Sequence, residues 1–316
     1  MDKEFKNSVL STLAYFDIFK HPLESRELYF YLWGLERKMS YYDFLIDLKE
    51  MVEKNLVEFK NGYYFFSGRS DLIKIRESKV RYLDKKMKIA KRGVKLIRFI
   101  PFVRAVFVCN TVASSTAGEG SDIDLFIIIK HGRIWLSRFL VIVLFILLRL
   151  RITKKKMSNK FCLSFFITDK NLDLSRVSIP GDDIYLAYWI SHLIPVYDPD
   201  NFLKRIIKEN GWVKNILRHF GRARSVGMSW NVNRLKRGFG FVKFFEKIWG
   251  TSYGDLLESQ SRGLQMSKMR KNKSIQNELD NRVVINDEML KFHENDRREF
   301  YRTKWQEKCV EYGVFE

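Results

Sequence analysis

Apolar residues recur every three or four positions in the first part of the chain, and this period predicts α-helices. The expected helices cover residues 5–19, 24–33 and 40–54. Ser40 is a typical N-cap residue for the third of them. Two short strand-like runs follow at 56–60 and 63–66. Since Asn61-Gly62 between them favours a two-residue turn, this segment is predicted to be a β-hairpin.

Beyond residue 68 helical and strand-like patterns alternate. A long basic segment at 69–99 is predicted to be a helix that links two parts of the chain and ends before Pro101. Apolar runs predict strands at 103–108, 122–130 and 161–168, and helices are expected at 134–150, 183–193 and 201–208. The predicted fold class is α+β. Its parts are a domain over 1–68, a linking helix over 69–100, a small mixed sheet with helices over 101–180 and a helical region over 181–316.

The chain carries a large positive charge, with 57 Lys and Arg against 37 Asp and Glu in 316 residues, a net charge of +20. This charge attracts nucleotides, nucleic acid or an anionic membrane, although solvated helix faces account for part of the excess. Cys109, Cys162 and Cys309 show no spacing typical of a zinc site or a disulfide framework. These cysteines, and a charged N-terminus without the apolar core of a signal peptide, favour the cytoplasm.

One segment resembles a membrane helix in composition. Residues 139–148, FLVIVLFILL, are apolar throughout and are flanked by Arg138, Arg149 and Arg151. A helix that spans a bilayer needs about 20 apolar residues, so no membrane span is predicted. The segment is interpreted as a buried helix, and a surface anchor assisted by the basic flanks is the alternative.

An acidic pair at the start of the second strand carries the candidate chemistry. Side chains alternate along a strand, so Asp122 and Asp124 project to the same face while Ile123 and Leu125 project to the other. Two neighbouring carboxylates repel each other unless a divalent cation lies between them. Mg²⁺, or Mn²⁺ in its place, is bound by a few carboxylates together with phosphate oxygens. The pair is therefore predicted to hold such an ion, and a solvated turn is the plain structural alternative.

Residues 106–129, VFVCNTVASSTAGEGSDIDLFIII, resemble the nucleotidyltransferase superfamily that includes polymerase beta, kanamycin nucleotidyltransferase and the minimal nucleotidyltransferases. In that family a strand is followed by Gly-Ser and, about ten residues later, by Asp-x-Asp between apolar residues, which SDIDLFII matches. The resemblance implies that Asp122 and Asp124 are catalytic metal ligands and that Asn110, Thr111 and Ser121 bind a nucleoside triphosphate. It also implies transfer of a nucleoside monophosphate to a hydroxyl group, with release of pyrophosphate.

The chain departs from this family pattern at two places. Asn110-Thr111 stands where the family has Gly-Ser, so a side chain is present where the backbone approaches the nucleotide. The family's third carboxylate lies on a later strand, and alternation along 161–168 places Ser164 there, with Asp169 just beyond the strand as a substitute. A missing third acid weakens deprotonation of the acceptor. A catalytically degenerate domain is therefore an alternative.

The first 68 residues resemble a winged helix-turn-helix domain, and the whole chain resembles uncharacterised bacterial nucleotidyltransferase-domain proteins. A winged helix implies DNA or RNA as a partner, so a non-enzymatic nucleic-acid-binding regulator is the second hypothesis. Two basic clusters favour such a partner: Lys85, Lys86, Lys88, Lys91, Arg92 and Lys95 on the linking helix, and Arg222, Arg224, Arg234, Lys236 and Arg237 near Trp230. A protein partner docked on the tail is the third hypothesis.

Overall fold

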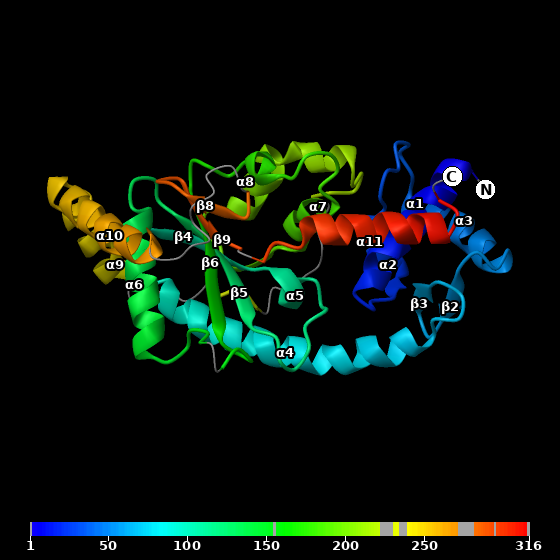
Figure 1. The fold of residues 1–316 in the computed structure, drawn as a ribbon, viewed down its shortest axis with the longest axis horizontal. Coiled ribbons are helices and arrows are strands. Elements are labelled where there is room, and N and C mark those ends of the chain that lie inside the picture. The colour runs from blue at the N-terminus through cyan, green and yellow to red at the C-terminus, as the bar shows by residue number, and fades with distance from the viewer. Residues whose placement is uncertain are drawn as a thin grey trace.

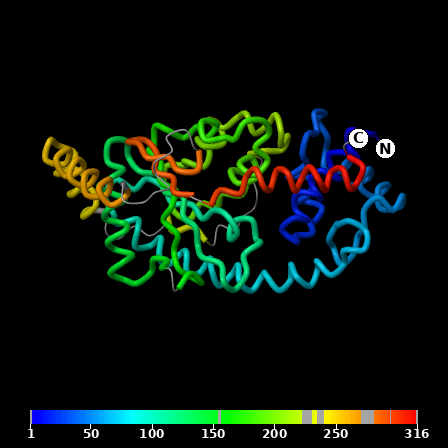
Figure 2. Tube along the Cα trace, viewed as in Figure 1, coloured from blue at the N-terminus to red at the C-terminus, as the bar shows by residue number. Residues whose placement is uncertain are grey.

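The computed structural model describes residues 2–153, 156–221, 230–233, 239–270, 281–293 and 295–314. Within these ranges the chain is a mixed α+β protein, which confirms the predicted fold class at that level. The molecule is elongated, with a six-stranded sheet and its helices toward one end and the N-terminal helices at the other (Figure 1). The two ends of the chain lie together (Figure 2), where Asn7 Nδ2 donates to the carbonyl oxygen of Val314 at 3.5 Å.

The N-terminal part combines helices with a small antiparallel sheet of order β1-β3-β2. Its elements are α1 (Lys3–Ile18), β1 (Leu23–Glu24), α2 (Ser25–Phe30), α3 (Tyr41–Glu53), β2 (Glu58–Lys60) and β3 (Tyr63–Phe65). Ser40 caps α3, because its Oγ accepts a hydrogen bond from the backbone N–H of Asp43 at 3.1 Å. Asn61 and Gly62 have φ angles of 51° and 85°, as the predicted two-residue hairpin turn requires.

The large sheet has the strand order β7-β4-β5-β6-β9-β8. Its strands are β4 (Val103–Val108), β5 (Ile123–Ile129), β6 (Phe161–Thr168), β7 (Ile194–Tyr197), β8 (Val283–Ile285) and β9 (Met289–Phe292). β5 and β6 are parallel and are joined by α6 (Ile134–Leu147), whereas the other neighbouring pairs are antiparallel. Residues 181–316, expected to be helical, therefore also supply β7, β8 and β9. These strands are short, and Pro195 weakens the strand pattern of β7.

Helices cover the chain between and after these strands. They are α4 (Asp71–Ile97), α5 (Asn110–Ala113), α7 (Ile184–His192), α8 (Phe202–Glu209), α9 (Phe239–Ile248), α10 (Ser252–Arg270) and α11 (Arg298–Glu311), with two 3₁₀ turns at Ser175–Val177 and Gly211–Asn215. α4 runs the length of the molecule beneath the N-terminal helices and the sheet (Figure 1). The predicted linking helix is thus present with nearly the expected bounds.

The two faces of the large sheet contribute to different buried clusters. On one face, Leu125 and Ile127 of β5 pack with residues of α4 and α6, such as Val94 and Val141. On the other face, Phe126 packs in a cluster that includes α7 and continues into the N-terminal helices. Since alternate residues share a face, Asp124 lies on the face that α7 covers.

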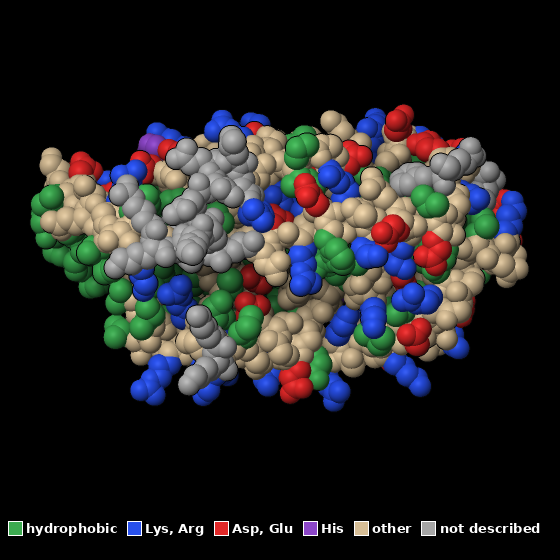
Figure 3. All heavy atoms as spheres, in the orientation of Figure 1, with side chains coloured by type: hydrophobic (Ala, Val, Ile, Leu, Met, Phe, Trp, Pro, Cys, Tyr) green, Lys and Arg blue, Asp and Glu red, His purple; other side chains and the backbone are tan. Residues whose placement is uncertain are grey.

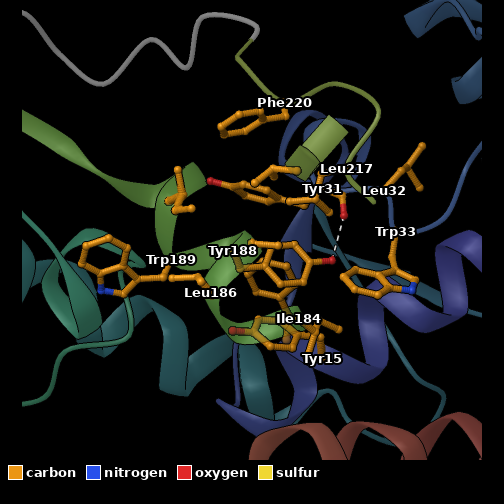
Figure 4. Packing of buried hydrophobic residues seen from close by; sticks show 14 of the residues in the cluster. Tyr15, Tyr31, Leu32, Trp33, Ile184, Leu186, Tyr188, Trp189, Leu217 and Phe220 are labelled. Carbon is orange, nitrogen blue, oxygen red and sulfur yellow. Dashed lines mark hydrogen bonds between the residues drawn. The ribbon is translucent and has the colours of Figure 1, made fainter. Parts of the chain in front are cut away.

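Aromatic side chains join the large sheet to the N-terminal helices (Figure 4). The ring of Tyr188 on α7 stacks on Tyr15 of α1 at a centroid distance of 4.2 Å, and its hydroxyl donates to the carbonyl oxygen of Tyr31 at 2.9 Å. From α11, Trp305 Nε1 donates to the carbonyl oxygen of Ser11 at 2.9 Å. α7 and α11 therefore tie the two parts into one continuous hydrophobic core.

The apolar segment 139–148 forms the second half of α6 and the residue after it. Val141 and Phe145 are buried, whereas Ile146, Leu147 and Leu148 are 51%, 74% and 47% exposed. The interpretation as a buried helix is therefore correct for the first part of the segment and wrong for its end. Among the described residues, none of the helices has the length and apolar character needed to cross a bilayer.

Gly93 lets α4 lie directly against β6. A β-carbon at this position would overlap the ring of Phe161, so we expect Gly93→Ala to lower the free energy of unfolding by about 1–3 kcal/mol. Ala is otherwise favoured over Gly in a helix by about 1 kcal/mol. Urea unfolding followed by circular dichroism measures the change. Gly263→Ala on α10, where a β-carbon meets nothing within 4 Å, is the control and should stabilise the chain. Equal effects of the two substitutions would contradict this packing.

Candidate functional site

Asp122 and Asp124 converge with a cysteine at the start of β5. In the parallel pairing of β5 and β6, Asp124 lies opposite Cys162. One carboxylate oxygen from each aspartate and the sulfur of Cys162 all lie within 4.8 Å of one another. As predicted, the two aspartates share a side of the strand, although Asp122 stands one residue before β5 begins. The third donor is thus a thiol from the neighbouring strand.

The register between β5 and β6 explains why Ser164 is not the residue beside Asp124. Asp124 pairs with Cys162, but Phe126 pairs with Phe165, so β6 contains one extra residue between these pairs. Ser164 lies two residues farther along β6 than the partner of Asp124, and its side chain hydrogen-bonds that of Cys162. Its Oγ lies 3.1 Å from Nε2 of His293 at the end of β9. Ser164 is therefore not the third residue of the cluster.

Asp169 is not the missing third acid either. Its Oδ1 accepts a hydrogen bond from the backbone N–H of His131 at 2.8 Å, beyond the C-terminal ends of β5 and β6. Asp169 follows Cys162 by seven residues, which corresponds to about 23 Å along an extended strand. It therefore lies at the opposite end of these strands from the aspartate pair.

Burial governs the electrostatics of this cluster. Asp124 is 8% exposed, and its burial, followed by the negative charge of Asp122, raises the pKa of its carboxyl group to about 7. Burial also raises the pKa of Asp122, and the charge of Lys86 opposes this rise. The pKa of the Cys162 thiol is raised to about 12, first by burial and then by Asp124. Near neutral pH a cation that binds both carboxylates would relieve their repulsion.

Asn110 occupies a left-handed backbone conformation at the start of α5, with a φ angle of 54°. This region favours glycine, and asparagine is one of the few other residues that adopts it readily. The side chain of Asn110 has two partners. It hydrogen-bonds the carboxylate of Asp124, which lowers the pKa of Asp124, and its Oδ1 accepts from Trp189 Nε1 at 2.6 Å. Asn110 therefore orients Asp124, and Trp189 on α7 holds Asn110.

The other two predicted nucleotide-binding residues lie around Asn110. Thr111 is exposed and lines, with Asn110, a small cavity of about 100 Å³. Ser121 is turned toward its own loop, since its Oγ accepts from the backbone N–H of Gly118 at 3.0 Å. The structure thus brings Asn110 together with the two aspartates, places Thr111 at the edge of this group, and directs the hydroxyl of Ser121 into the loop.

Lys86 on α4 fixes this loop through hydrogen bonds. Its Nζ donates to the carbonyl oxygens of Ser121 and Glu119, at 2.6 and 3.2 Å, and to Oδ1 of Asn159 at 3.2 Å. Lys86 was expected to belong to a basic surface on the linking helix, but its side chain is buried in these contacts. The sequence does not reveal this role, because Lys86 precedes the aspartates by more than thirty residues and sits in a run of lysines.

A cavity of about 650 Å³ borders Asn110 on the same side of the sheet. Trp189 and Tyr185 of α7 and Tyr301 of α11 form aromatic walls. Its charged and polar lining comes from the stretch that runs from the end of β9 to the start of α11, namely Lys291, His293, Asn295, Asp296, Arg297 and Arg298. Burial, and next the charge of Arg298, lowers the pKa of Lys291 to about 8. Sequence reasoning missed this segment, because it lies more than 160 residues after the aspartate pair.

Of the two predicted basic clusters, only the one on the linking helix lies within the described residues. Lys85, Lys88, Arg92 and Lys95 are exposed on α4, at spacings of three and four residues, and form one charged face. The second cluster, which consists of Arg222, Arg224, Arg234, Lys236 and Arg237, lies outside the described residues. Trp230 near it is partly buried and packs against the core on the α4 and α6 face of the sheet.

Comparison with known proteins gives no relative from which a function could be transferred: the chain matches no family model, no curated protein and no solved structure.

The raised pKa of Asp124 predicts a pH-dependent stability in the absence of metal. The folded chain holds the proton of Asp124 up to about pH 7, whereas an unfolded aspartate loses it near pH 4, so the free energy of unfolding should fall as the pH rises between these values. The shift corresponds to at most about 4 kcal/mol. Asp124→Asn should shrink this dependence and raise stability at pH 8.

Urea unfolding at pH 5 and pH 8 in the presence of a chelator tests this expectation. Asp169→Asn, at the opposite end of β6 from the aspartate pair, serves as the matched control. An Asp124→Asn variant with the same pH dependence as the native chain would show that the Asp124 carboxyl is not the group responsible.

Proposed function

We propose that this chain is a divalent-metal-dependent nucleotidyltransferase of the polymerase-beta-like superfamily. In this proposal residues 101–180 carry the transferase core and residues 1–68 form a winged-helix domain. The observation that carries the proposal is the convergence of Asp122, Asp124 and Cys162 beside a loop whose first residue, Asn110, binds Asp124. The resemblance of residues 106–129 to the family supports the same assignment.

The donor set fits a divalent cation. Two carboxylates within 4.8 Å of each other, one of them almost fully buried, carry a repulsion that a bound Mg²⁺ or Mn²⁺ would remove. Asp122 and Asp124 would hold the ion together with phosphate oxygens of a nucleoside triphosphate. Such an ion supplies charge neutralisation at the phosphate under attack. The role of Asn110 is then to keep Asp124 in position to bind it.

The substrate would lie on the α7 side of the sheet, where both cavities border Asn110. We place the phosphates against Asn110 and Thr111 at the start of α5. In the reaction, an oxygen of the acceptor hydroxyl bonds to the α-phosphorus while the bond from this phosphorus to the bridging oxygen breaks and pyrophosphate leaves. The aromatic walls of the larger cavity, Tyr185, Trp189 and Tyr301, suit a ring of the nucleoside or of the acceptor.

Cys162 limits how the acceptor loses its proton. A thiol with a pKa of about 12 stays protonated near neutral pH and is a poor general base. The proton would therefore pass to a carboxylate of the pair or to solvent. We expect slower turnover than in a site with three carboxylates, because a protonated thiol neither takes the proton of the acceptor nor binds the metal well.

The alternative, a non-enzymatic regulator that binds nucleic acid through its winged helix, has less support. In that mode α3 would enter a groove of the duplex. Lys49 on this helix pairs with Glu53 at 3.6 Å, and Lys54, the residue after it, pairs with Glu50 at 2.6 Å. The exposed face of α3 also presents Tyr42 and Ile46. These features suit a protein contact better than a phosphate backbone, so the aspartate pair remains the better candidate for function.

Nucleotide binding tests the proposed function. Isothermal titration calorimetry should detect binding of at least one of ATP, GTP, CTP and UTP in the presence of Mn²⁺ or Mg²⁺ and no binding with a chelator. We expect the double variant Asp122→Asn, Asp124→Asn to weaken this binding at least tenfold, because the metal loses both charged ligands. Asp169→Asn should bind as the native chain does. Binding that needs no metal, or that survives in the double variant, would contradict the proposal.

Cys162 offers a second test. We expect Cys162→Asp to raise the affinity for Mg²⁺ at least about tenfold, because a third carboxylate replaces a thiol that is protonated near neutral pH and is then a poor metal ligand. Cys162→Ser is the matched control, since it introduces a neutral oxygen of similar size and should bring no such gain. Equal Mg²⁺ affinity in the Asp and Ser variants would show that residue 162 does not bind the ion.

A further inference from the structure

One end of the molecule exposes a continuous apolar surface, seen as the gathered hydrophobic side chains over α9, α10 and α6 in Figure 3. α9 contributes Phe241, Phe244 and Ile248, and α10 contributes Tyr253, Leu256 and Leu264. The end of α6 adds Ile146, Leu147 and Leu148. We call these nine residues the apolar end. They make up about half of the large exposed hydrophobic side chains in the described residues.

The helices of the apolar end are apolar on both sides. Phe241, Phe244 and Ile248 follow one another at spacings of three and four residues, so they form one stripe along α9. Another side of the same helix faces the core through Val242, which is buried, and Phe245 lies between the two sides, with its ring 4.6 Å from that of Phe241 and 4.8 Å from that of Trp249. The stripe is therefore not the core face of α9. A second apolar side that is exposed to water marks a site of contact with another molecule or with a membrane.

The acidic residues of α9 and α10 are paired with other groups of the protein. Glu246 pairs with Arg104 at 2.8 Å, and Asp255 pairs with Arg133 at 2.7 Å. Glu258 accepts hydrogen bonds from the backbone N–H groups of Trp135 and Leu136 at the start of α6, at 2.9 and 2.8 Å. These are the acidic residues of both helices, and each is engaged by the protein.

Lysines, in contrast, stand beside the apolar stripe. Lys243 and Lys247 on α9 and Lys268 on α10 are exposed, and Arg149 is exposed next to Leu148. The apolar end therefore combines aliphatic and aromatic side chains with a positive rim. This combination is typical of helices that lie in the interface of a membrane with anionic lipids.

We propose that the apolar end docks on the surface of an anionic phospholipid bilayer. The exposed side chains would enter the boundary between headgroups and acyl chains while the lysines contact the headgroups. A second copy is disfavoured as the occupant, because each chain carries a net charge of +20 and two copies repel. Nucleic acid is disfavoured because leucine and isoleucine side chains neither stack on bases nor bind phosphate.

This docking is independent of the proposed catalytic function. The apolar end belongs to the helices that cover the α4 and α6 face of the large sheet, whereas Asp124 and its cavity lie on the α7 face. The candidate site would therefore stay open to water when the opposite side of the molecule lies on a bilayer. The surface-anchor alternative for residues 139–148 also agrees with this arrangement, since the exposed end of α6 is part of the surface.

Vesicle flotation with the full chain tests the proposal. Vesicles of phosphatidylcholine with about one third phosphatidylserine should carry the native chain upward, and pure phosphatidylcholine vesicles should carry much less. We expect the triple variant Phe241→Ser, Phe244→Ser, Leu264→Ser to bind the anionic vesicles at least tenfold more weakly. Lys243→Gln with Lys247→Gln should weaken binding at least fivefold, and the native interaction should weaken at high salt.

A matched control uses exposed apolar residues elsewhere on the molecule. Tyr42→Ser, Phe59→Ser, Val310→Ser removes side chains of comparable exposure, and this variant should bind as the native chain does. Circular dichroism checks that all variants are folded.

Several outcomes would overturn the proposal: a native chain that stays in solution with anionic vesicles, or equal loss in both triple variants. A native dimer in light scattering that the apolar-end variant dissociates, without vesicle binding, would assign the surface to a second copy. Binding of single-stranded RNA that only the apolar-end variant loses, again without vesicle binding, would assign it to nucleic acid.

Discussion

The arrangement of the candidate site depends on one unfavourable placement, the burial of the Asp124 carboxylate beside Asp122. A buried charge is costly unless it gains partners, and neighbouring groups supply them. Asn110 hydrogen-bonds Asp124, and Trp189 fixes Asn110 from α7. Lys86 holds the loop that precedes the pair and places a positive charge near Asp122. Three distant parts of the chain thus cooperate to keep two carboxylates close together.

Local signals were sufficient to predict most elements. The apolar runs of β4 and β6, the Asn61-Gly62 turn and the Ser40 cap are short-range patterns, and the structure confirms them. The same alternation also placed the two aspartates on one side of a strand. β7, β8 and β9 escaped prediction because strands of three or four residues have too few alternating positions to stand out from helical sequence.

The rest of the site could not be predicted, because it depends on contacts between segments far apart in sequence. Nothing near Lys86 distinguishes it from the exposed lysines beside it, and only the fold buries it against the loop. The register of β6 against β5 likewise depends on the fold. It makes Cys162 and not Ser164 the neighbour of Asp124, and alternation within one strand cannot reveal how two strands are paired.

The thiol of Cys162 affects the stability of the chain when no metal is bound. Three carboxylates within a few ångströms would repel strongly, so the fold would depend on a bound ion for stability. A protonated Cys162 adds no third negative charge beside the aspartates, and the pair can share a proton while no ion is bound. The same substitution removes a strong base from the site. We infer that Cys162 favours stability of the metal-free chain at the expense of the rate at which an acceptor hydroxyl is deprotonated.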